Sequence, residues 1–165
     1  MCGILGLINF KKKFSSDKIV SILDSASKLQ NFRGPDNSST WINQKKNVGL
    51  AHNRLSILDL SSNGNQPMTS KCRRYSISYN GEIYNFLKLK EDLKDKVPFK
   101  SNSDTEVILE HISYNGIENT VKMIDGMFSL AVWDEKEECI YLARDRVGIK
   151  PLYWTKNSEF LFFCS

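Results

Sequence analysis

The chain has 165 residues, a length typical of one domain with a substantial hydrophobic core. Its composition, 41% hydrophobic and 25% charged, is that of a soluble globular protein. The net charge of +4 is modest and forms no basic stripe, so nucleic acid is not an expected partner. No apolar run approaches the ~18 residues of a membrane span, so no membrane association is expected either.

The cysteines are spaced too irregularly for a zinc site or a disulfide framework. The four stand at positions 2, 72, 139 and 164, with no CxxC pair and only two histidines in the chain. Unpaired spacing is typical of a reducing compartment, and no secretory leader precedes Cys2. We therefore expect a cytoplasmic protein without a metal.

The first third of the chain predicts a strand, a helix and two short strands. Residues 2–10 form an apolar run of strand type. Ser15-Ser16-Asp17 begins a helix with capping residues. Its apolar face is Ile19, Ile22, Leu23, Ala26 and Leu29, and it stops before Arg33-Gly34-Pro35-Asp36. Two strands at 39–43 and 48–51 follow, joined by a polar turn.

The remainder predicts one strand, two helices and then strands only. Residues 74–79 alternate as a strand, 84–95 have helical spacing, and a capping box at 103–106 begins a helix that ends at Gly116. After a short segment at 121–124, strands are predicted at 127–133, 139–144, 152–154 and 160–163. Because helices and strands are segregated, we expect an α+β fold with antiparallel sheet. The last strand lacks a closing element, so we expect a chain truncated at its C-terminus.

Cys2 directly follows the initiator methionine and precedes the first strand. Cysteine is small, so we expect Met1 to be removed, which leaves a thiol and a free α-amine on one residue. An amine of pKa about 7.7–8.0 can take a proton from a thiol of pKa about 8.5 at little cost. A nucleophile activated by a chain-terminal amine is a known route to covalent catalysis. The alternative is a small buried hydrophobic residue.

Asn80-Gly81 follows the alternating strand, where an Asn-Gly pair predicts a hairpin turn. The functional alternative is an oxyanion hole, formed by the side-chain amide and the neighbouring backbone N–H. Glu82 either accepts from an ammonium group or is solvated.

Two charged residues are candidates for ligand binding. Arg54 stands in an apolar stretch and is either a bidentate clamp for a carboxylate or a surface cation; taken alone, the surface cation is favoured. Asp104 follows the predicted N-cap Ser103 and either stabilises the helix dipole or holds an ammonium group.

Two further segments are loops with functional alternatives. Residues 33–36 are most simply a turn, but such a loop could line or close a pocket. Residues 143–151 are densely charged and are most simply a solvated loop, but the apolar neighbours on both sides favour partial burial and ion pairing as the alternative.

Together these motifs resemble the glutamine amidotransferase domain of the class II, N-terminal-nucleophile type. The resemblance runs nearly end to end and is greatest to the N-terminal half of glutamine-hydrolysing asparagine synthetases. The blocks at 54–57 and 144–153 favour that branch over relatives that aminate sugars or phosphoribosyl substrates. Seven blocks carry it in this order: Met1-Cys2-Gly3-Ile4, Arg33 to Asp36, Arg54-Leu55-Ser56-Ile57, Gln66-Pro67, Asn80 to Asn85, Ser103-Asp104-Thr105-Glu106 and Ala143 to Tyr153.

The resemblance implies a four-layer αββα sandwich, two antiparallel sheets between helix layers, over residues 1–165. It also implies that Cys2 attacks the side-chain amide of glutamine while its α-amine relays the proton. The oxyanion would be held by the side chain of Asn80 and the N–H of Gly81, and water would hydrolyse the γ-glutamyl thioester to glutamate.

The resemblance further implies a site for both ends of the glutamine amino-acid group. Arg54 would pair with the α-carboxylate, and Asp104 and Glu82 would receive the α-ammonium. The other implied substrate contacts are Leu55, Ile57 and Leu58. Such a pair of clamps selects a free amino acid over a side-chain amide within a protein.

The expected partners are glutamine and a C-terminal synthetase domain, with a homodimer as an option. The synthetase domain, which would need ATP and Mg²⁺, is absent, since no nucleotide-binding Gly-rich loop occurs; no cofactor is expected for this domain. Phe32 stands where many relatives carry histidine. Alternatives are the same chemistry feeding another acceptor, such as a surface-polysaccharide sugar, or a non-catalytic assembly or regulatory domain if Met1 is retained.

Overall fold

The computed structural model describes residues 1–165 and contains two antiparallel sheets. The first has the strand order β2-β3-β1-β9-β8 and the second β4-β5-β6-β7. The strands of the first sheet are β1 (Gly3–Asn9), β2 (Asn37–Ile42), β3 (Val48–Arg54), β8 (Tyr153–Lys156) and β9 (Phe160–Cys164). Those of the second are β4 (Met68–Thr69), β5 (Tyr75–Ile83), β6 (Gly126–Asp134) and β7 (Cys139–Arg144).

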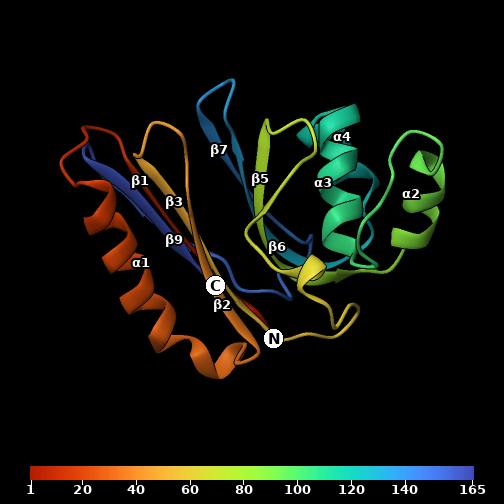
Figure 1. The fold of residues 1–165 in the computed structure, drawn as a ribbon, viewed down its shortest axis with the longest axis horizontal. Helices are drawn as coiled ribbons and strands as arrows, with labels where there is room; N and C mark the ends of the chain where they lie inside the picture. The colour runs from red at the N-terminus through yellow and green to blue at the C-terminus, as the bar shows by residue number, and fades with distance from the viewer.

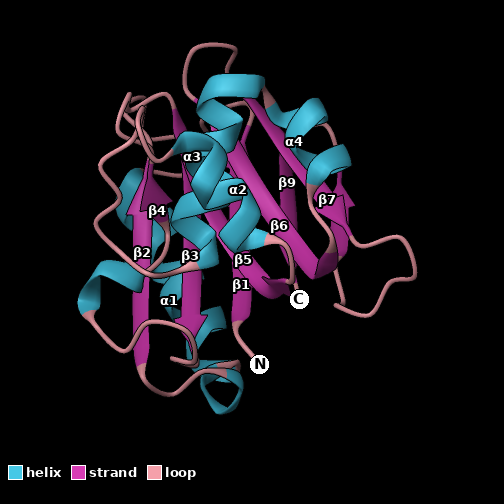
Figure 2. Ribbon diagram, turned by 90° about the vertical axis from the view of Figure 1, so that its right-hand side faces the viewer, coloured by secondary structure: helices cyan, strands magenta, loops and turns pink.

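The helices lie on the outer faces of the two sheets (Figure 1). Helix α1 (Ser16–Leu29) covers the first sheet, whereas α2 (Phe86–Leu93), α3 (Asp104–Asn115) and α4 (Ile117–Met123) lie over the second (Figure 2). The predicted four-layer αββα sandwich is therefore confirmed. None of these helices has the length and apolarity needed to cross a membrane.

Three hydrophobic clusters hold the four layers together. One joins α1 to the first sheet through residues such as Leu7 and Leu23, and one fills the space between the sheets around Leu50 and Phe163. The third and largest packs α3 against β5 and β6. Because both faces of each sheet are covered, β1 and β3 are buried at every position, as is expected of strands inside a sandwich.

The two-residue period of the strands decides which side chains face the space between the sheets. In β3 the even positions 48 and 50 belong to the inter-sheet cluster, so His52 and Arg54 continue the same face. Here the apolar core gives way to polar groups: His52 Nε2 lies 3.0 Å from the carbonyl oxygen of Tyr79, and Ser78 Oγ donates to Ala51 O at 3.0 Å. The layer between the sheets thus changes from apolar to polar toward the end of the molecule that holds the N-terminus.

Helix α1 begins as predicted, but its buried face differs at the end. The hydroxyl of Ser15 accepts from the N–H of Lys18 as an N-cap. Ile19 and Leu23 are fully buried, whereas Leu29 is 79% exposed. Leu29 has the right spacing for the face, but it stands in the last turn, beyond the part of α1 that packs on the strands.

Helix α3 begins at the predicted capping residue, yet the capping box is incomplete. Ser103 Oγ accepts from Glu106 N at 3.3 Å, as expected. The carboxylate of Glu106 instead accepts from Lys100 N and from the N–H and hydroxyl of Ser101, while the N–H of Ser103 donates to Ser101 Oγ. The prediction that Glu106 closes the box on Ser103 was wrong, because the preceding loop offers the carboxylate more donors.

The predicted hairpin turn at Asn80-Gly81 was also wrong. Both residues lie within β5, where Asn80 pairs with Ser129 and Gly81 with Phe128 of β6. A Cβ on Gly81 would lie 2.5 Å from the carbonyl oxygen of Met127, so the glycine serves close strand approach instead of a turn. The long partner strand β6 continues the pairing past the point where a hairpin was expected.

We expect Leu23→Ala to lower the free energy of unfolding by about 2–5 kcal/mol, because the substitution leaves a cavity between α1 and the first sheet. Leu29→Ala, in the same helix but exposed, is expected to change it by less than about 0.5 kcal/mol. Urea denaturation of both variants measures the difference. Equal losses would contradict the assigned face of α1.

Burial lowers the pKa of His52 from its ordinary value of 6.5 to about 4, with a smaller contribution from the charge of Arg54. As the pH falls, His52 is therefore protonated near pH 6.5 in the unfolded chain but only near pH 4 in the folded chain. Stability is lost as the pH falls through this window, by about 2 kcal/mol between pH 7 and pH 5. Urea denaturation at both pH values should show a smaller acid loss in His52→Gln; an identical loss would show that His52 is not responsible.

Candidate active site

A cavity of about 370 Å³ opens where the polar end of the inter-sheet layer meets the loops that follow β3 and precede α3. Its lining comes from β3, β5, the start of α3 and the N-terminus. All residues predicted from the sequence to belong to the site line this cavity: Cys2, Arg54, Leu55, Ile57, Leu58, Asn80, Gly81, Glu82 and Asp104. The fold therefore brings together residues spread over a hundred positions of sequence.

Cys2 stands just before β1, half-buried, with its sulfur against the backbone of Leu55. The N–H of Leu55 donates to Cys2 Sγ at 3.4 Å, and the thiol lies 3.7 Å from Leu55 O. The carbonyl of Cys2 accepts from Arg33 Nε at 3.2 Å. The sulfur is thus held at the cavity wall by backbone groups of Leu55.

Asn80 projects into the cavity with an amide nitrogen that has no protein acceptor. The residue is 2% exposed, and its Nδ2 is buried without a hydrogen-bond partner. Buried polar groups of this kind are rare, and a functional explanation is expected for each. An anionic oxygen in the cavity would supply the missing acceptor.

The register of β5 directs the N–H of Gly81 toward the same side as the cavity. Phe128, opposite Gly81, makes its backbone hydrogen bonds to Asp145 on the β7 side, so this pair is not hydrogen-bonded across β5 and β6. Tyr79 and Ile83 stand two residues before and two after Gly81. Their N–H groups therefore point away from β6, to the opposite edge of β5. They donate to Gln66 Oε1 and Asp104 Oδ2, and Gly81 N–H lies between them.

Arg54 is buried, so the surface-cation interpretation was wrong. Its Nη1 donates to Ser61 O at 2.7 Å and Asn65 Oδ1 at 2.9 Å, and its Nη2 donates to Asp59 O. Nε–H makes no protein hydrogen bond and Nη2 makes only one, so the guanidinium keeps donors that a carboxylate could accept from. A Cβ on Gly64 would lie 2.2 Å from Nη2, so only glycine leaves room for the guanidinium.

Asp104 and Glu82 supply negative charge on the other side of the cavity. Asp104 is buried, and its Oδ2 accepts from the hydroxyl of Tyr79 at 2.6 Å and the N–H of Ile83 at 3.0 Å. Burial raises the pKa of Asp104, which these hydrogen bonds partly oppose. A cation bound beside Asp104 would offset that desolvation. Glu82 is exposed at the end of β5.

The loop at 33–36 supports the site from outside the cavity and does not line it. Besides the contact of Arg33 with Cys2, Asp36 Oδ2 accepts from Ser56 N at 2.7 Å. The loop therefore holds the backbone on both sides of the Cys2 sulfur. Phe32 beside it is exposed.

The charged segment 143–151 is partly buried as predicted, but the predicted ion pairing was wrong. Asp145 accepts backbone N–H groups from Ile149 and Lys150, and Arg144 donates to the carbonyls of Gly148 and Lys150. The charged side chains of Arg144 and Asp145 therefore hydrogen-bond to backbone groups of the turn at residues 148–150 and form no ion pair with each other. Lys150 reaches the cavity lining through this turn.

Sequence analysis missed several residues of the cavity wall. Gln66 was noted only as part of a motif, yet it bridges Tyr79 N and Thr105 Oγ1. Tyr79 and Lys150 were assigned to a strand and a charged loop, and Asp59 to no role. The only feature of the sequence that could have pointed to one of these residues is the Gln66-Pro67 motif, which contains Gln66. No group of three or more His, Cys, Asp or Glu side chains is placed to bind one metal ion.

Comparisons with known proteins agree with this geometry. Residues 1–165 match the family model of the glutamine amidotransferase domain. The chain is 41% identical to glutamine-hydrolysing asparagine synthetase 3 of Bacillus subtilis, over 98% of this chain and 26% of that protein. It is 42% identical to asparagine synthetase 2 of the same organism, over 100% of this chain and 21% of that protein.

A solved structure shares the fold. The glutamine phosphoribosylpyrophosphate amidotransferase of B. subtilis superposes with a TM-score of 0.75 at 18% identity, over 99% of this chain and 41% of that one. The chain spans about a quarter of the length of the curated relatives that it matches. The match over its whole length and the sandwich fold lead to one conclusion: this chain belongs to the glutamine amidotransferase domain family.

Proposed function

We propose that this domain hydrolyses the side-chain amide of glutamine to glutamate and ammonia, with Cys2 as the nucleophile. The observation that carries the proposal is the unpartnered Nδ2 of Asn80, buried in the same cavity as the Cys2 sulfur and beside the outward-facing N–H of Gly81. Two unpartnered donors that line the same cavity as a thiol form an arrangement suited to acyl transfer.

The reaction proceeds through a thioester. Cys2 Sγ attacks the amide carbon while the α-amine of Cys2 accepts the thiol proton, and the carbonyl oxygen becomes an oxyanion held by Asn80 and Gly81. Collapse of this intermediate breaks the C–N bond, and the nitrogen takes a proton from the ammonium of Cys2 and leaves as ammonia. Water then attacks the thioester, which releases glutamate and restores the thiol.

Substrate selection rests on the charges at the two sides of the cavity. The free donors of the Arg54 guanidinium suit the α-carboxylate, and Asp104, with Glu82 at the rim, suits the α-ammonium. The exposed Ile57 and the half-buried Leu55 border the space between them. A ligand lacking either charge would leave a buried partner uncompensated, which costs more than a lost surface contact.

The ammonia acceptor lies with a part of the protein outside this chain. The relatives are named glutamine-hydrolysing asparagine synthetases, which supports a synthetase domain as the partner and asparagine formation as the use of the ammonia. The test is asparagine formation by the full-length protein from glutamine, aspartate and ATP. Glutamine hydrolysis without asparagine would instead support another acceptor, such as a sugar.

We expect Asn80→Ala to lower kcat for glutamate release about 100- to 1,000-fold with little change in KM, because it removes one oxyanion donor. The measurement is steady-state glutamate release from glutamine. Cys2→Ala should abolish release, whereas Asn119→Ala, an exposed asparagine on α4, should match the wild type. Unchanged kcat in Asn80→Ala would rule out the oxyanion role.

The state of the N-terminus should control activity. With Met1 attached, the nitrogen of Cys2 is an amide and cannot accept the thiol proton. Intact mass spectrometry separates the two forms, and the form that retains Met1 should release glutamate no faster than Cys2→Ala. Full activity with Met1 retained would remove the α-amine from the mechanism. A native protein that always retains Met1 would instead support the non-catalytic alternative.

A further inference from the structure

Asp59 connects the loop that holds Arg54 to the loop that precedes Asp104. Its backbone carbonyl accepts from Arg54 Nη2, while its carboxylate accepts from Ser61 N at 2.8 Å and from Asn102 N at 2.8 Å. Hydrogen bonds from Ser61 and Asn102 hold the pKa of Asp59 below its ordinary value, so the carboxylate is ionised at neutral pH. Asp59 thus contacts Arg54 through its backbone carbonyl and the loop before α3 through its carboxylate.

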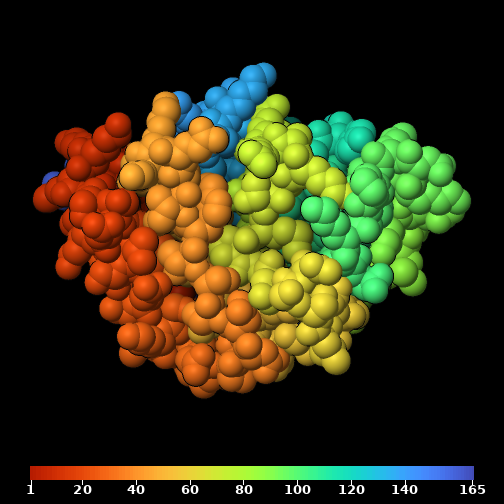
Figure 3. Space-filling model, viewed as in Figure 1, coloured from red at the N-terminus to blue at the C-terminus, as the bar shows by residue number.

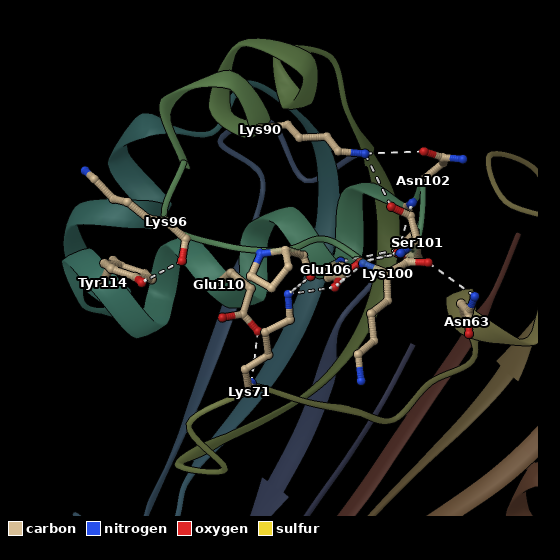
Figure 4. Close-up of polar contacts among 12 residues, drawn as sticks. Asn63, Lys71, Lys90, Lys96, Lys100, Ser101, Asn102, Glu106, Glu110 and Tyr114 are labelled. Atoms are coloured by element: carbon tan, nitrogen blue, oxygen red, sulfur yellow. Dashed lines mark hydrogen bonds and ion pairs between the residues drawn. The ribbon is translucent and has the colours of Figure 1, made fainter. Parts of the chain in front are cut away.

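Asn63 makes a second connection between the same two loops. Its Nδ2 donates to the carbonyl of Lys100 at 3.2 Å (Figure 4). On the surface, the yellow segment that follows β3 adjoins the green segment that precedes α3 (Figure 3). These contacts cross between residues some forty positions apart in sequence, and no strand pairing joins the two loops.

The loop that Asp59 and Asn63 contact is itself fixed to α3. The carboxylate of Glu106, in the first turn of α3, accepts from Lys100 N at 3.0 Å and from Ser101 N at 2.7 Å (Figure 4). Ser103 caps the helix, and Asp104 is its first residue. A displacement of residues 100–102 would therefore pull on the start of α3 and strain the hydrogen bonds that hold the Asp104 carboxylate to Tyr79 and Ile83 of β5.

We propose that Asp59 and Asn63 form a latch that sets the spacing between Arg54 and Asp104, and so determines how tightly glutamine is held at both ends at once. The inference rests on the proposed function and deepens it. Asp59 is a positioning residue, since it acts through Arg54 on one side and through the 100–102 loop on the other. Without the latch, Arg54 could still bind an α-carboxylate and Asp104 an α-ammonium. The two side chains would no longer be held at the distance at which one glutamine contacts both.

This role gives a specific kinetic signature. Two groups that are held at the correct distance bind a two-ended ligand with little loss of freedom, and that advantage disappears when their spacing fluctuates. A ligand with only one charged end does not need the spacing. Breaking the latch should therefore weaken binding of glutamine more than binding of an analogue that lacks the α-ammonium or one that lacks the α-carboxylate.

The test compares Asp59→Ala with wild type in the full chain, with three amide substrates. For glutamine we expect KM to rise about tenfold, equivalent to about 1.4 kcal/mol, with kcat within about twofold. For 4-carbamoylbutanoate, which lacks the α-ammonium, and 4-aminobutanamide, which lacks the α-carboxylate, we expect KM to change less than about threefold. Ammonia release measures all three.

Asp92→Ala is the matched control, since Asp92 is an exposed carboxylate on α2 away from the cavity, and it should match wild type throughout. Asn63→Ala should show the same pattern as Asp59→Ala with a smaller rise in the KM for glutamine. If Asp59→Ala does not fold by circular dichroism, Asp59→Asn, which loses the charge and keeps one acceptor oxygen, takes its place.

Two outcomes would overturn the latch. One is an unchanged KM for glutamine; the other is a rise for glutamine that is matched by an equal rise for either analogue, which would indicate damage to the group that binds that analogue's charged end. Failure of the proposed function looks different. In that case the wild type would neither bind nor hydrolyse glutamine, and Cys2→Ala would be indistinguishable from it.

Discussion

The open edge of β5 is the constraint on which the site depends. Its neighbour β4 has only two residues, so beyond Ile77 one edge of β5 has no strand to pair with. The structure closes this edge with side chains, Gln66 at Tyr79 N and Asp104 at Ile83 N, and leaves Gly81 N–H between them. Backbone groups that cannot pair inside a protein must find another partner. Here that partner is the proposed substrate.

The sandwich explains why nucleophile and donors meet. Both sheets present alternate residues to one shared layer, which is apolar around Phe163 and polar around His52. Cys2 precedes β1 and Asn80 lies near the end of β5, and both reach the polar end of that layer. A covalent mechanism needs a fixed nucleophile and fixed oxyanion donors, and two packed sheets hold them more rigidly than loops would.

The proposed substrate contacts, by contrast, lie where a strand and a helix meet loops. Arg54 is held by carbonyls of the segment that follows β3, whereas Asp104 begins α3 directly after the 100–102 loop and is held by Tyr79 and Ile83 of β5. Neither loop has ladder hydrogen bonds of its own, so their relative position depends on a few side chains, Asp59 and Asn63 among them. In the proposed reaction, this division places the chemistry on the sheets and substrate specificity on segments that depend on loop contacts.

The sequence by itself determined the elements and the membership of the site. Apolar periodicity located the strands and helices, Ser15 and Ser103 stand at helix starts, and all nine site residues predicted from the ordered motifs line the cavity. Only the tertiary structure decided what depends on neighbours distant in the chain. Pairing with β6 placed Asn80-Gly81 inside a strand, carbonyls of a folded loop buried Arg54, and donors at residues 100 and 101 drew Glu106 away from the capping box. Local patterns encode local preference, whereas burial and hydrogen-bond partners are set by contacts across the fold.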